Sequence, residues 1–438
     1  MTYIPYDMYT ERIERTDTVK RLGKVTQVVG MVIESAGPAV SIGRLCTIEN
    51  RHDGSKVPAE VVGFRDDRIL LMPYGPITGI TPGAIVTSTS DTLRVPVGQE
   101  LIGRVLGGLG EPIDGKGPIL TSVTKHVNNN PIPVLKRNRI TKPLLTGIKA
   151  IDMLTTIGQG QRMGIFAGSG VGKSIMLGMM ARGSSADVNV IALVGERGRE
   201  VRDFIERDMG KDGLKRSVVV AVSSDQPALI RIKGAMVATT IAEYFREQGK
   251  HVLLLLDSVT RIAMAQREIG LAVGEPPATK GYTPSVFALL PTLLERAGNT
   301  GKGSITGLYT VLVEGDDFNE PISDAVRSIL DGHVSLSRRL ASMNQYPAVD
   351  ALDSISRLMP EVASDEERQL AAEVRRLMAV YREAEDLINI GAYVKGSNPK
   401  IDRAIEKYEP LNEFFRQGIF ELADHKQCLT TLQDILNN

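Results

Sequence analysis

This chain of 438 residues contains two cysteines and no tryptophan, and its formal net charge is zero. The two cysteines, Cys46 and Cys428, lie far apart and lack metal-ligand spacing, which argues against a disulfide framework. Basic and acidic residues number 52 each, so the chain lacks the positive surplus typical of proteins that bind the phosphate backbone of nucleic acids. This balance makes a helicase a weaker interpretation.

Long apolar runs are missing as well. No stretch approaches the roughly 18 apolar residues that a membrane-spanning helix requires, and the N-terminus carries charges where a signal peptide needs an apolar segment. Hydrophobic residues still make up 42% of the chain, which is enough for a sizeable core. We therefore expect a cytoplasmic globular protein, and the length favours about three domains.

The distribution of residue types divides the chain into five segments. Residues 1–22 mix charges with a few apolar residues, a pattern typical of a flexible arm or a short exposed helix. Short β-rich runs between turn residues predict a small β-barrel over 23–96, with a β-sandwich as the alternative. The Gly-, Pro- and Asn-rich stretch 97–145 is expected to form an extended linker. Apolar runs alternating with helical patterns predict a parallel α/β domain over 146–360, and charged amphipathic stretches predict a helical domain over 361–438.

The strongest functional motif is AGSGVGKS, which follows the apolar run MGIFA and opens a helical pattern. A strand before and a helix after such a loop are the context of a P-loop, although Ala167 replaces the first glycine of the strict pattern. Backbone N–H groups of a P-loop wrap a polyphosphate, its lysine reaches the β- and γ-phosphates, and its serine ligates Mg²⁺. The predicted nucleotide-binding residues are Gly168, Ser169, Gly170, Val171, Gly172, Lys173 and Ser174, and the last is also a predicted metal ligand.

Two acidic residues follow apolar runs that are expected to be buried strands. Asp257 ends the run VLLLLD, and the carboxyl ends of parallel strands form the ligand edge of a sheet. Alone, such an aspartate is more often a helix N-cap, but together with a P-loop it is predicted to hold Mg²⁺. Glu196 follows the run VNVIALVG in a segment crowded with charges. Orienting the attacking water and forming a solvated charged turn are equally good interpretations of Glu196.

Several longer segments resemble a known superfamily. GERGREVRDFIERD, LLLLDSVTRIAMAQRE and YPAVDALDSISR resemble the rotary ATPases, which include the catalytic subunits of F-type ATP synthases. Within that superfamily, AGSGVGKS, GYTPSVFALLPTLLERAGN and VLVEGDDFNEPI are most similar to the type III protein export ATPases, with the flagellar branch favoured over the virulence branch. The resemblance implies a β-barrel, a RecA-like P-loop domain with a parallel sheet, and a C-terminal helical domain.

The resemblance also implies roles for single residues. It makes Glu196 the carboxylate that activates water, with Arg197 nearby. Tyr346 of YPAVD is expected to stack on adenine, and Arg357 of SISR is expected to reach the neighbouring subunit's nucleotide as an arginine finger. Tyr393 of NIGAYVKG is expected to close the adenine pocket from the helical domain. Without the resemblance, Tyr346 would be a turn or core aromatic and Arg357 a surface charge.

Three other functions are the alternatives. A synthase catalytic subunit would share the fold and the chemistry, but the C-terminal helices lack an acidic DELSEED-type segment and the P-loop ends in Ser instead of Thr. An RNA translocase related to the terminator Rho should display stacking aromatics in a basic groove, whereas 23–96 contains only Phe64 and Tyr74. A non-catalytic nucleotide-binding subunit would not need the intact set of P-loop and acidic residues.

The function implied by the resemblance is ATP hydrolysis by a homohexamer with Mg-ATP at its subunit interfaces, which powers or regulates type III export of flagellar proteins. The implied partners are a stator-like regulator, a central stalk protein, export chaperone–cargo complexes and the membrane export gate. The protein would lie in the cytoplasm, peripherally at the inner face of the cell membrane, and no nucleic acid is expected as a partner.

Overall fold

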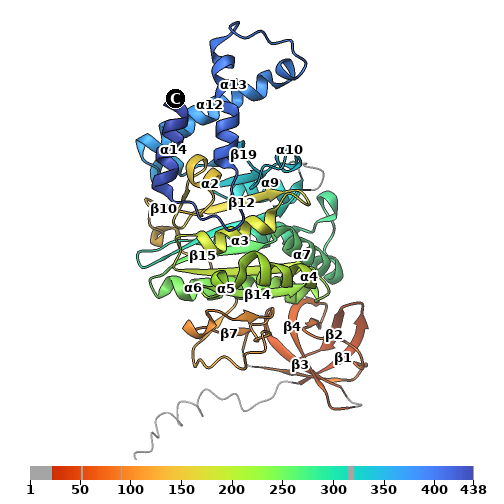
Figure 1. The fold of residues 1–438 in the computed structure, drawn as a ribbon. Coiled ribbons are helices and arrows are strands. Elements are labelled where there is room, and N and C mark those ends of the chain that lie inside the picture. Colours follow the sequence, from red (N-terminus) through yellow and green to blue (C-terminus); the bar gives the residue numbers. More distant parts are fainter. Residues whose placement is uncertain (1–21, 51–52, 90, 314–319, 438) are drawn as a thin grey trace, which may run out of the picture.

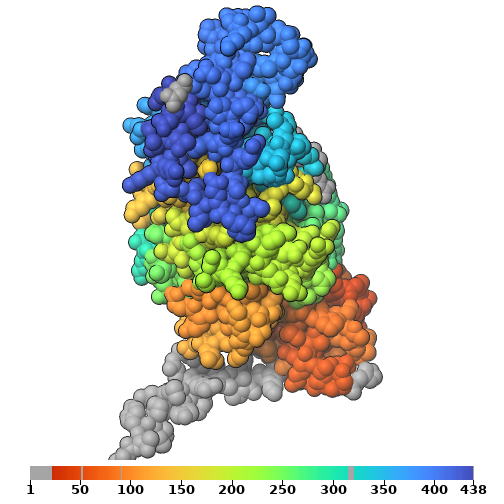
Figure 2. Space-filling model, viewed as in Figure 1, coloured from red at the N-terminus to blue at the C-terminus, as the bar shows by residue number. Residues whose placement is uncertain are grey.

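A computed structural model of the chain describes residues 22–50, 53–89, 91–313 and 320–437. A β-barrel, a central α/β part and a helical part follow one another along the long axis of the molecule (Figure 1). The space-filling view shows the same order from red to blue (Figure 2). The expected fold class is thereby confirmed. The expected N-terminal arm lies outside the described residues except for Leu22, which begins the first strand.

The N-terminal part is a closed antiparallel barrel with strand order β1-β2-β5-β4-β3-β6. Inward-facing side chains such as Val25, Ile33 and Val61 form its buried core, because alternate residues of a strand point to the same face. Strand β1 pairs with both β2 and β6, which closes the sheet and excludes the alternative β-sandwich. The strands are β1 (Leu22–Val29), β2 (Val32–Ala36), β3 (Leu45–Glu49), β4 (Lys56–Arg65), β5 (Arg68–Pro73) and β6 (Ile85–Ser88).

The segment between the barrel and the P-loop part differs from the expected extended linker. Strands β7 (Arg94–Pro96) and β9 (Thr124–His126) pair with each other. Strand β8 (Val105–Leu106) pairs in parallel with β14 of the central sheet. This position buries both of its apolar side chains. The segment therefore contributes regular structure to the central part. Its other elements are the short helices η1 (Gln99–Leu101) and η2 (Val134–Lys136), and strand β10 (Pro143–Leu144), which pairs with β11 (Ile157–Gly158).

The central part is built on a nine-stranded sheet with strand order β19-β18-β12-β17-β15-β13-β14-β8, in which β16 pairs beside β17. Strands from β18 to β8 along this order run parallel, and the edge strand β19 is antiparallel to β18. The carboxyl ends of β12, β13 and β15 therefore meet at one edge of the sheet. The strands are β12 (Arg162–Ala167), β13 (Val188–Glu196), β14 (Ser217–Ser223), β15 (His251–Asp257), β16 (Gly298–Asn299), β17 (Ser304–Leu312), β18 (Gly332–Leu336) and β19 (Val349–Ser356).

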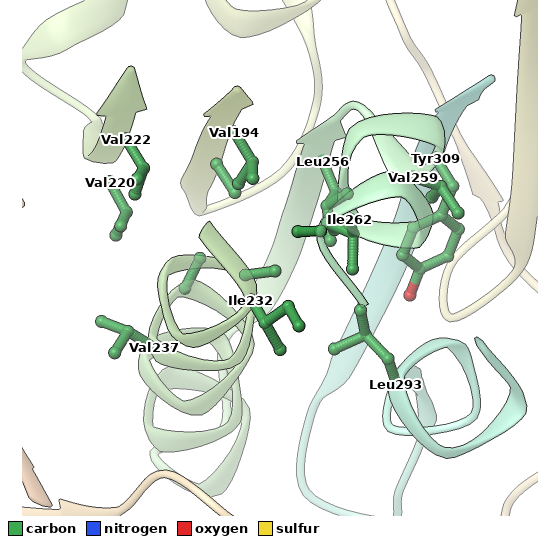
Figure 3. Packing of buried hydrophobic residues seen from close by; sticks show 14 of the residues in the cluster. Val194, Val220, Val222, Ile232, Val237, Leu256, Val259, Ile262, Leu293 and Tyr309 are labelled. Carbon is green, nitrogen blue, oxygen red and sulfur yellow. The ribbon is translucent and has the colours of Figure 1, made fainter. Parts of the chain in front are cut away.

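Helices cover both faces of this sheet. On one face Val194 and Leu256 pack against Ile232 and Ile262 of helices α6 and α7, with Leu293 of α8 alongside (Figure 3). The other face packs against α2 and α3. The helices are α2 (Lys149–Leu154), α3 (Lys173–Gly183), α4 (Gly198–Asp203), the π-helix η3 (Phe204–Met209), α5 (Gly210–Leu214), α6 (Ala228–Glu247), α7 (Val259–Val273), η4 (Thr279–Gly281), α8 (Pro284–Leu294), α9 (Pro321–Ile329), α10 (Arg338–Ser342) and α11 (Met359–Val362).

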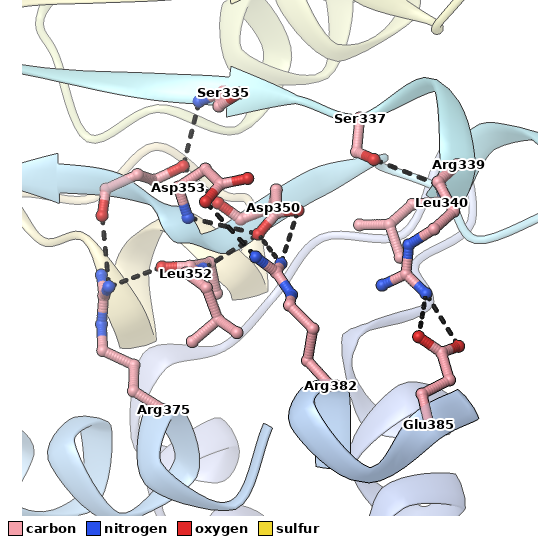
Figure 4. A network of polar contacts seen from close by, with 12 residues as sticks. Ser335, Ser337, Arg339, Leu340, Asp350, Leu352, Asp353, Arg375, Arg382 and Glu385 are labelled. Carbon is pink, nitrogen blue, oxygen red and sulfur yellow. Dashed lines mark hydrogen bonds and ion pairs between the residues drawn. The ribbon is translucent and has the colours of Figure 1, made fainter. Parts of the chain in front are cut away.

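The C-terminal part consists of α12 (Asp365–Asn389), α13 (Pro399–Phe415) and α14 (His425–Asn437). Arg382 of α12 forms two contacts of 2.6 and 2.7 Å with the Asp350 carboxylate of β19 (Figure 4). Arg375 of the same helix donates to the backbone carbonyls of Leu154 and Ala351. These arginines attach the helical part to the central sheet. Within the described ranges, every helix is too short or too polar to cross a bilayer.

Candidate functional site

The P-loop occupies the turn between β12 and α3, whose first residue is Lys173. Gly170 and Gly172 have φ angles of 79° and 86°, in the left-handed region that glycine adopts without strain. A Cβ atom at Gly172 would also lie only 3.2 Å from the ring of Tyr346. The loop faces a cavity of about 690 Å³. Every predicted P-loop residue lines this cavity except Val171, whose side chain is buried in the core.

Two carboxylates from paired strands approach the lysine of the P-loop. Asp257, the last residue of β15, is only 3% exposed and forms an ion pair with Lys173. The same Asp257 oxygen accepts a hydrogen bond from the Thr310 hydroxyl at 2.6 Å. Glu196, the last residue of β13, has its Oε1 atom 3.6 Å from Lys173 Nζ. One ammonium group and two carboxylates thus converge at the carboxyl edge of a parallel sheet, where ligands of such sheets bind.

The surroundings of Glu196 change its acidity. Burial raises the pKa of Glu196 above its ordinary value, Lys173 opposes this shift, and the charge of Asp257 adds to it. A raised pKa makes a carboxylate a better acceptor for a proton or a hydrogen bond from water. Glu200 and Arg197 also line the cavity, but their side chains are 51% and 82% exposed and pair with each other at 3.5 Å. Burial therefore distinguishes Glu196 from its charged neighbours.

The structure places Tyr346 beside the P-loop and does not bring Tyr393 there. Tyr393 lies in the connection between α12 and α13, at the far end of the helical part (Figure 1). Its hydroxyl is 3.0 Å from both the Asn398 carbonyl and an Asp402 carboxylate oxygen, which hold the ring in that connection. The backbone N–H of Gln417, after α13, instead donates to the Tyr346 carbonyl at 2.9 Å. Within this chain the loop at Gln417 is thus the segment of the helical part that contacts Tyr346, and the adenine contact of Tyr393 stays a prediction.

Arg357 is exposed and lies away from the P-loop cavity of its own chain. It follows the edge strand β19, where its N–H donates to the Asp331 carbonyl at 3.0 Å. Its side chain lines a second cavity of about 420 Å³, which has no lining residue in common with the first. A contact between Arg357 and a nucleotide would therefore require the P-loop of another subunit.

Comparison with known proteins agrees with this arrangement. Residues 147–356 match the ATP synthase alpha/beta family, nucleotide-binding domain, and residues 25–90 match the β-barrel domain of the same family. The flagellum-specific ATP synthase of Bacillus subtilis (strain 168) is 55% identical over 429 residues, which cover 97% of this chain and 98% of that protein. This chain belongs to the ATP synthase alpha/beta family. Residues 363–434 match the T3SS EscN ATPase C-terminal domain.

Two solved structures have the same fold. The assembled ATPase EscN of the enteropathogenic E. coli type III secretion system superposes with a TM-score of 0.89 at 43% identity, and the match covers 94% of this chain and 100% of EscN. EscN in complex with its central stalk EscO superposes with a TM-score of 0.87 at the same identity and coverage. The similarity extends over the barrel, the nucleotide-binding domain and the helical part.

The oxygen atoms around the P-loop of this chain are suitable ligands for the Mg²⁺ ion of a bound nucleotide. Ser174 lines the cavity and Asp257 contacts Lys173 of the same loop, and both supply the hard oxygen donors that Mg²⁺ prefers. In the described ranges no cluster of three or more His, Cys, Asp or Glu side chains forms a complete metal site. Mg²⁺ in nucleotide sites commonly takes one or two protein ligands and completes its shell with phosphate and water, so two or three oxygen donors suffice.

Sequence reasoning missed three arginines that line the same cavity, namely Arg207, Arg261 and Arg338. Arg261 packs so closely on Gly195 that a Cβ atom there would lie 2.9 Å from its own Cβ. Among the described residues, the buried Nε atom of Arg261 has no hydrogen-bond partner. A usable signal was its position one helical turn after Asp257, because the first turn of a helix that follows a strand lies near the same edge of the sheet.

Proposed function

We propose that this chain is a P-loop ATPase that hydrolyses ATP to ADP and phosphate and energises type III export of flagellar proteins. The observation that carries the proposal is the convergence of Glu196 and Asp257 on Lys173, which lines the P-loop cavity together with Glu196. The full-length similarity to a flagellum-specific relative supports the flagellar branch. The similarity to EscN supports virulence-type secretion as a second candidate.

Each step of hydrolysis has a candidate side chain. The P-loop N–H groups and Lys173 bind the phosphates, and Ser174 and Asp257 would hold Mg²⁺, which would supply positive charge that neutralises the phosphates. Glu196 accepts a hydrogen bond from the attacking water and orients it towards the γ-phosphorus. The water oxygen forms the new bond to the γ-phosphorus as the bond to the ADP oxygen breaks, and Glu196 accepts the proton that the water loses. Arg197, on the rim of the cavity, adds positive charge beside the phosphates.

The adenine base would be held by Tyr346, whose ring lies next to the P-loop. Stacking of a base on an aromatic ring contributes about 1–3 kcal/mol in nucleic-acid complexes, and a similar contribution is expected here. The loop at Gln417 supports this ring through the backbone hydrogen bond to Tyr346. Closure of the adenine site therefore involves the helical part of the chain.

A single subunit provides only part of the proposed site, because Arg357 lies on another face. We infer a homohexamer in which Arg357 of one subunit serves the nucleotide of the next, an arrangement that a ring of head-to-tail contacts allows. EscN has been solved as an assembly and with a central stalk, which supports a ring and a stalk partner for this chain. A stator-like regulator, chaperone–cargo complexes, an export gate and a peripheral position at the inner face of the membrane complete the proposal.

Mixing two inactive variants tests both the site and the ring. Lys173→Ala removes the phosphate-binding charge, and Arg357→Ala removes the finger but leaves its own P-loop complete. Each variant alone should hydrolyse ATP poorly. When they co-assemble at random in equal amounts, about a quarter of the interfaces join an intact Lys173 to an intact Arg357, so phosphate release should reappear.

The controls separate catalysis from folding and assembly. Arg376→Ala removes an arginine that is 68% exposed on α12 and pairs with Glu373, and it should leave turnover unchanged. Thermal melting checks that the inactive variants remain folded, and native mass spectrometry checks that mixed rings form. Full activity of Arg357→Ala alone would refute the finger, and full activity of Lys173→Ala would refute the P-loop assignment.

A further inference from the structure

The cavity beside Arg357 contains a second arginine that the proposed mechanism does not use. Arg327, in the last turn of α9, lines this cavity of about 420 Å³ together with Arg357, Asp324 and His333. Both arginine side chains are exposed. The two guanidinium groups come from different elements, α9 and the end of β19, and line the same cavity.

Rigid elements fix the relative position of the two arginines. Arg357 follows β19, and β19 pairs with β18 through the partners Gly332 and Ser356. The N–H of Arg357 donates to Asp331, which lies between α9 and β18. Helix α9, β18 and β19 therefore form one frame that presents both guanidinium groups on the same face. A site built on such elements holds its side chains more precisely than a site on a free loop.

The charge of this cavity is not balanced by its own residues. In the described part of the chain, neither Arg327 nor Arg357 forms a side-chain ion pair, and Asp324 is the only acidic residue in the lining. His333 adds no stable positive charge, because burial and the two nearby arginines lower its pKa. Two guanidinium groups in one hollow repel each other, and this repulsion is relieved when an anion binds between them.

We propose that Arg327 is a second arginine acting across the subunit interface, and that it contacts the phosphates of the neighbouring subunit's nucleotide beside Arg357. The inference rests on the proposed function, because that function places Arg357 at the neighbour's nucleotide. A triphosphate presents several charged oxygens along its length, so it can engage two guanidinium groups at once. Arg327 would thus contact substrate, and the neighbour's P-loop would supply the rest of the site.

The test compares Arg327→Gln with the parent protein at a concentration at which rings form. Arg327→Gln removes the proposed charge-assisted hydrogen bond from the guanidinium group to phosphate. The kcat/KM for ATP should therefore fall about tenfold or more. Binding of a fluorescent ATP analogue to dilute, unassembled protein should stay unchanged, because the P-loop of the same chain is complete. Arg327→Lys keeps the charge but loses the planar fork, and it should show a smaller loss.

Matched controls come from the same cavity and from another helix. Asp324→Asn removes the acidic neighbour on α9 and should not lower kcat/KM, and Arg376→Gln should behave as the parent. A parent-like kcat/KM in folded Arg327→Gln or Arg327→Lys rings would overturn the inference. If Arg327→Gln fails to form rings both with and without nucleotide, the inference is also overturned. That result would show that Arg327 pairs with a carboxylate of the neighbouring subunit and not with the phosphates. Failure of the proposed function is seen separately, as full activity of Arg357→Ala.

Discussion

Glu196 offers the sharpest test of the catalytic assignment, because Glu196→Gln changes charge and leaves size almost unaltered. The side chain is 15% exposed and 3.6 Å from Lys173 Nζ, so glutamine fits the same space and Lys173 keeps its ion pair with Asp257. Loss of a general base costs about 10²–10⁴ in rate, which corresponds to a barrier about 3–5 kcal/mol higher. We expect kcat to fall by at least about a hundredfold while Mg-ATP binding is retained.

The matched control is Glu200→Gln, four positions along the chain. Glu200 also lines the cavity, and its hydrogen bond to Glu196 helps to raise the pKa of Glu196, but its side chain is 51% exposed and pairs with Arg197, so water screens its charge. Glu200→Gln should lower kcat only slightly. The assay is steady-state phosphate release, together with equilibrium binding of a fluorescent ATP analogue. If both substitutions lower kcat equally and only mildly, Glu196 is better interpreted as part of a solvated charged turn.

The pH dependence of kcat provides a second test of the role of Glu196. Glu196 must be ionised to accept a hydrogen bond from water, and burial raises its pKa. Activity should therefore be present above the raised pKa and be lost as the pH falls through it, at a higher pH than for an ordinary glutamate. Glu196→Gln should abolish this acidic limb from the residual activity. A limb that persists unchanged would assign the titration to another group.

Two further predictions concern the adenine site and the core. Tyr346→Ala should raise the KM for ATP by about tenfold in steady-state assays, whereas Tyr393→Ala should change it less, and an equal effect of the two substitutions would support the adenine contact expected for Tyr393. Arg296→Met should destabilise the fold by about 3–5 kcal/mol, because it leaves Glu243 buried without its partner at 2.7 Å, and an unaltered midpoint in chemical denaturation would refute this estimate.

Sequence patterns predicted the elements of secondary structure that are determined by residues close together in the sequence. The alternation of apolar residues predicted the barrel and the parallel sheet, because a strand's period and its flanking turns are local properties. The same reasoning placed Asp257 and Glu196 at the ends of strands, and Lys173 in the loop between a strand and the helix that follows it. Parallel strands bring such ends to one edge of a sheet, so the topology rule was enough to expect these three side chains close together.

Other features depend on how distant segments pack, and local patterns could not predict them. The resemblance places Tyr393 at the adenine, but only the structure shows its hydrogen bond to Asp402 in the connection between two helices. Gln417 approaches Tyr346 only because α13 turns back onto the central part. In the same way Val105 joins the sheet through a parallel pairing with Val219, more than a hundred positions further along the chain.

The charges of the two cavities explain why turnover should depend on assembly. In the P-loop cavity Lys173 already has two carboxylate partners of its own subunit, and the other cations of the lining are Arg197, Arg207, Arg261 and Arg338. Arg327 and Arg357 lie in the other cavity without ion pairs among the described residues. Joining the two faces would bring uncompensated guanidinium groups to the phosphates where charge develops, and such arginines are worth about 10³–10⁵ in rate. Specific activity should therefore rise with protein concentration until the rings are complete.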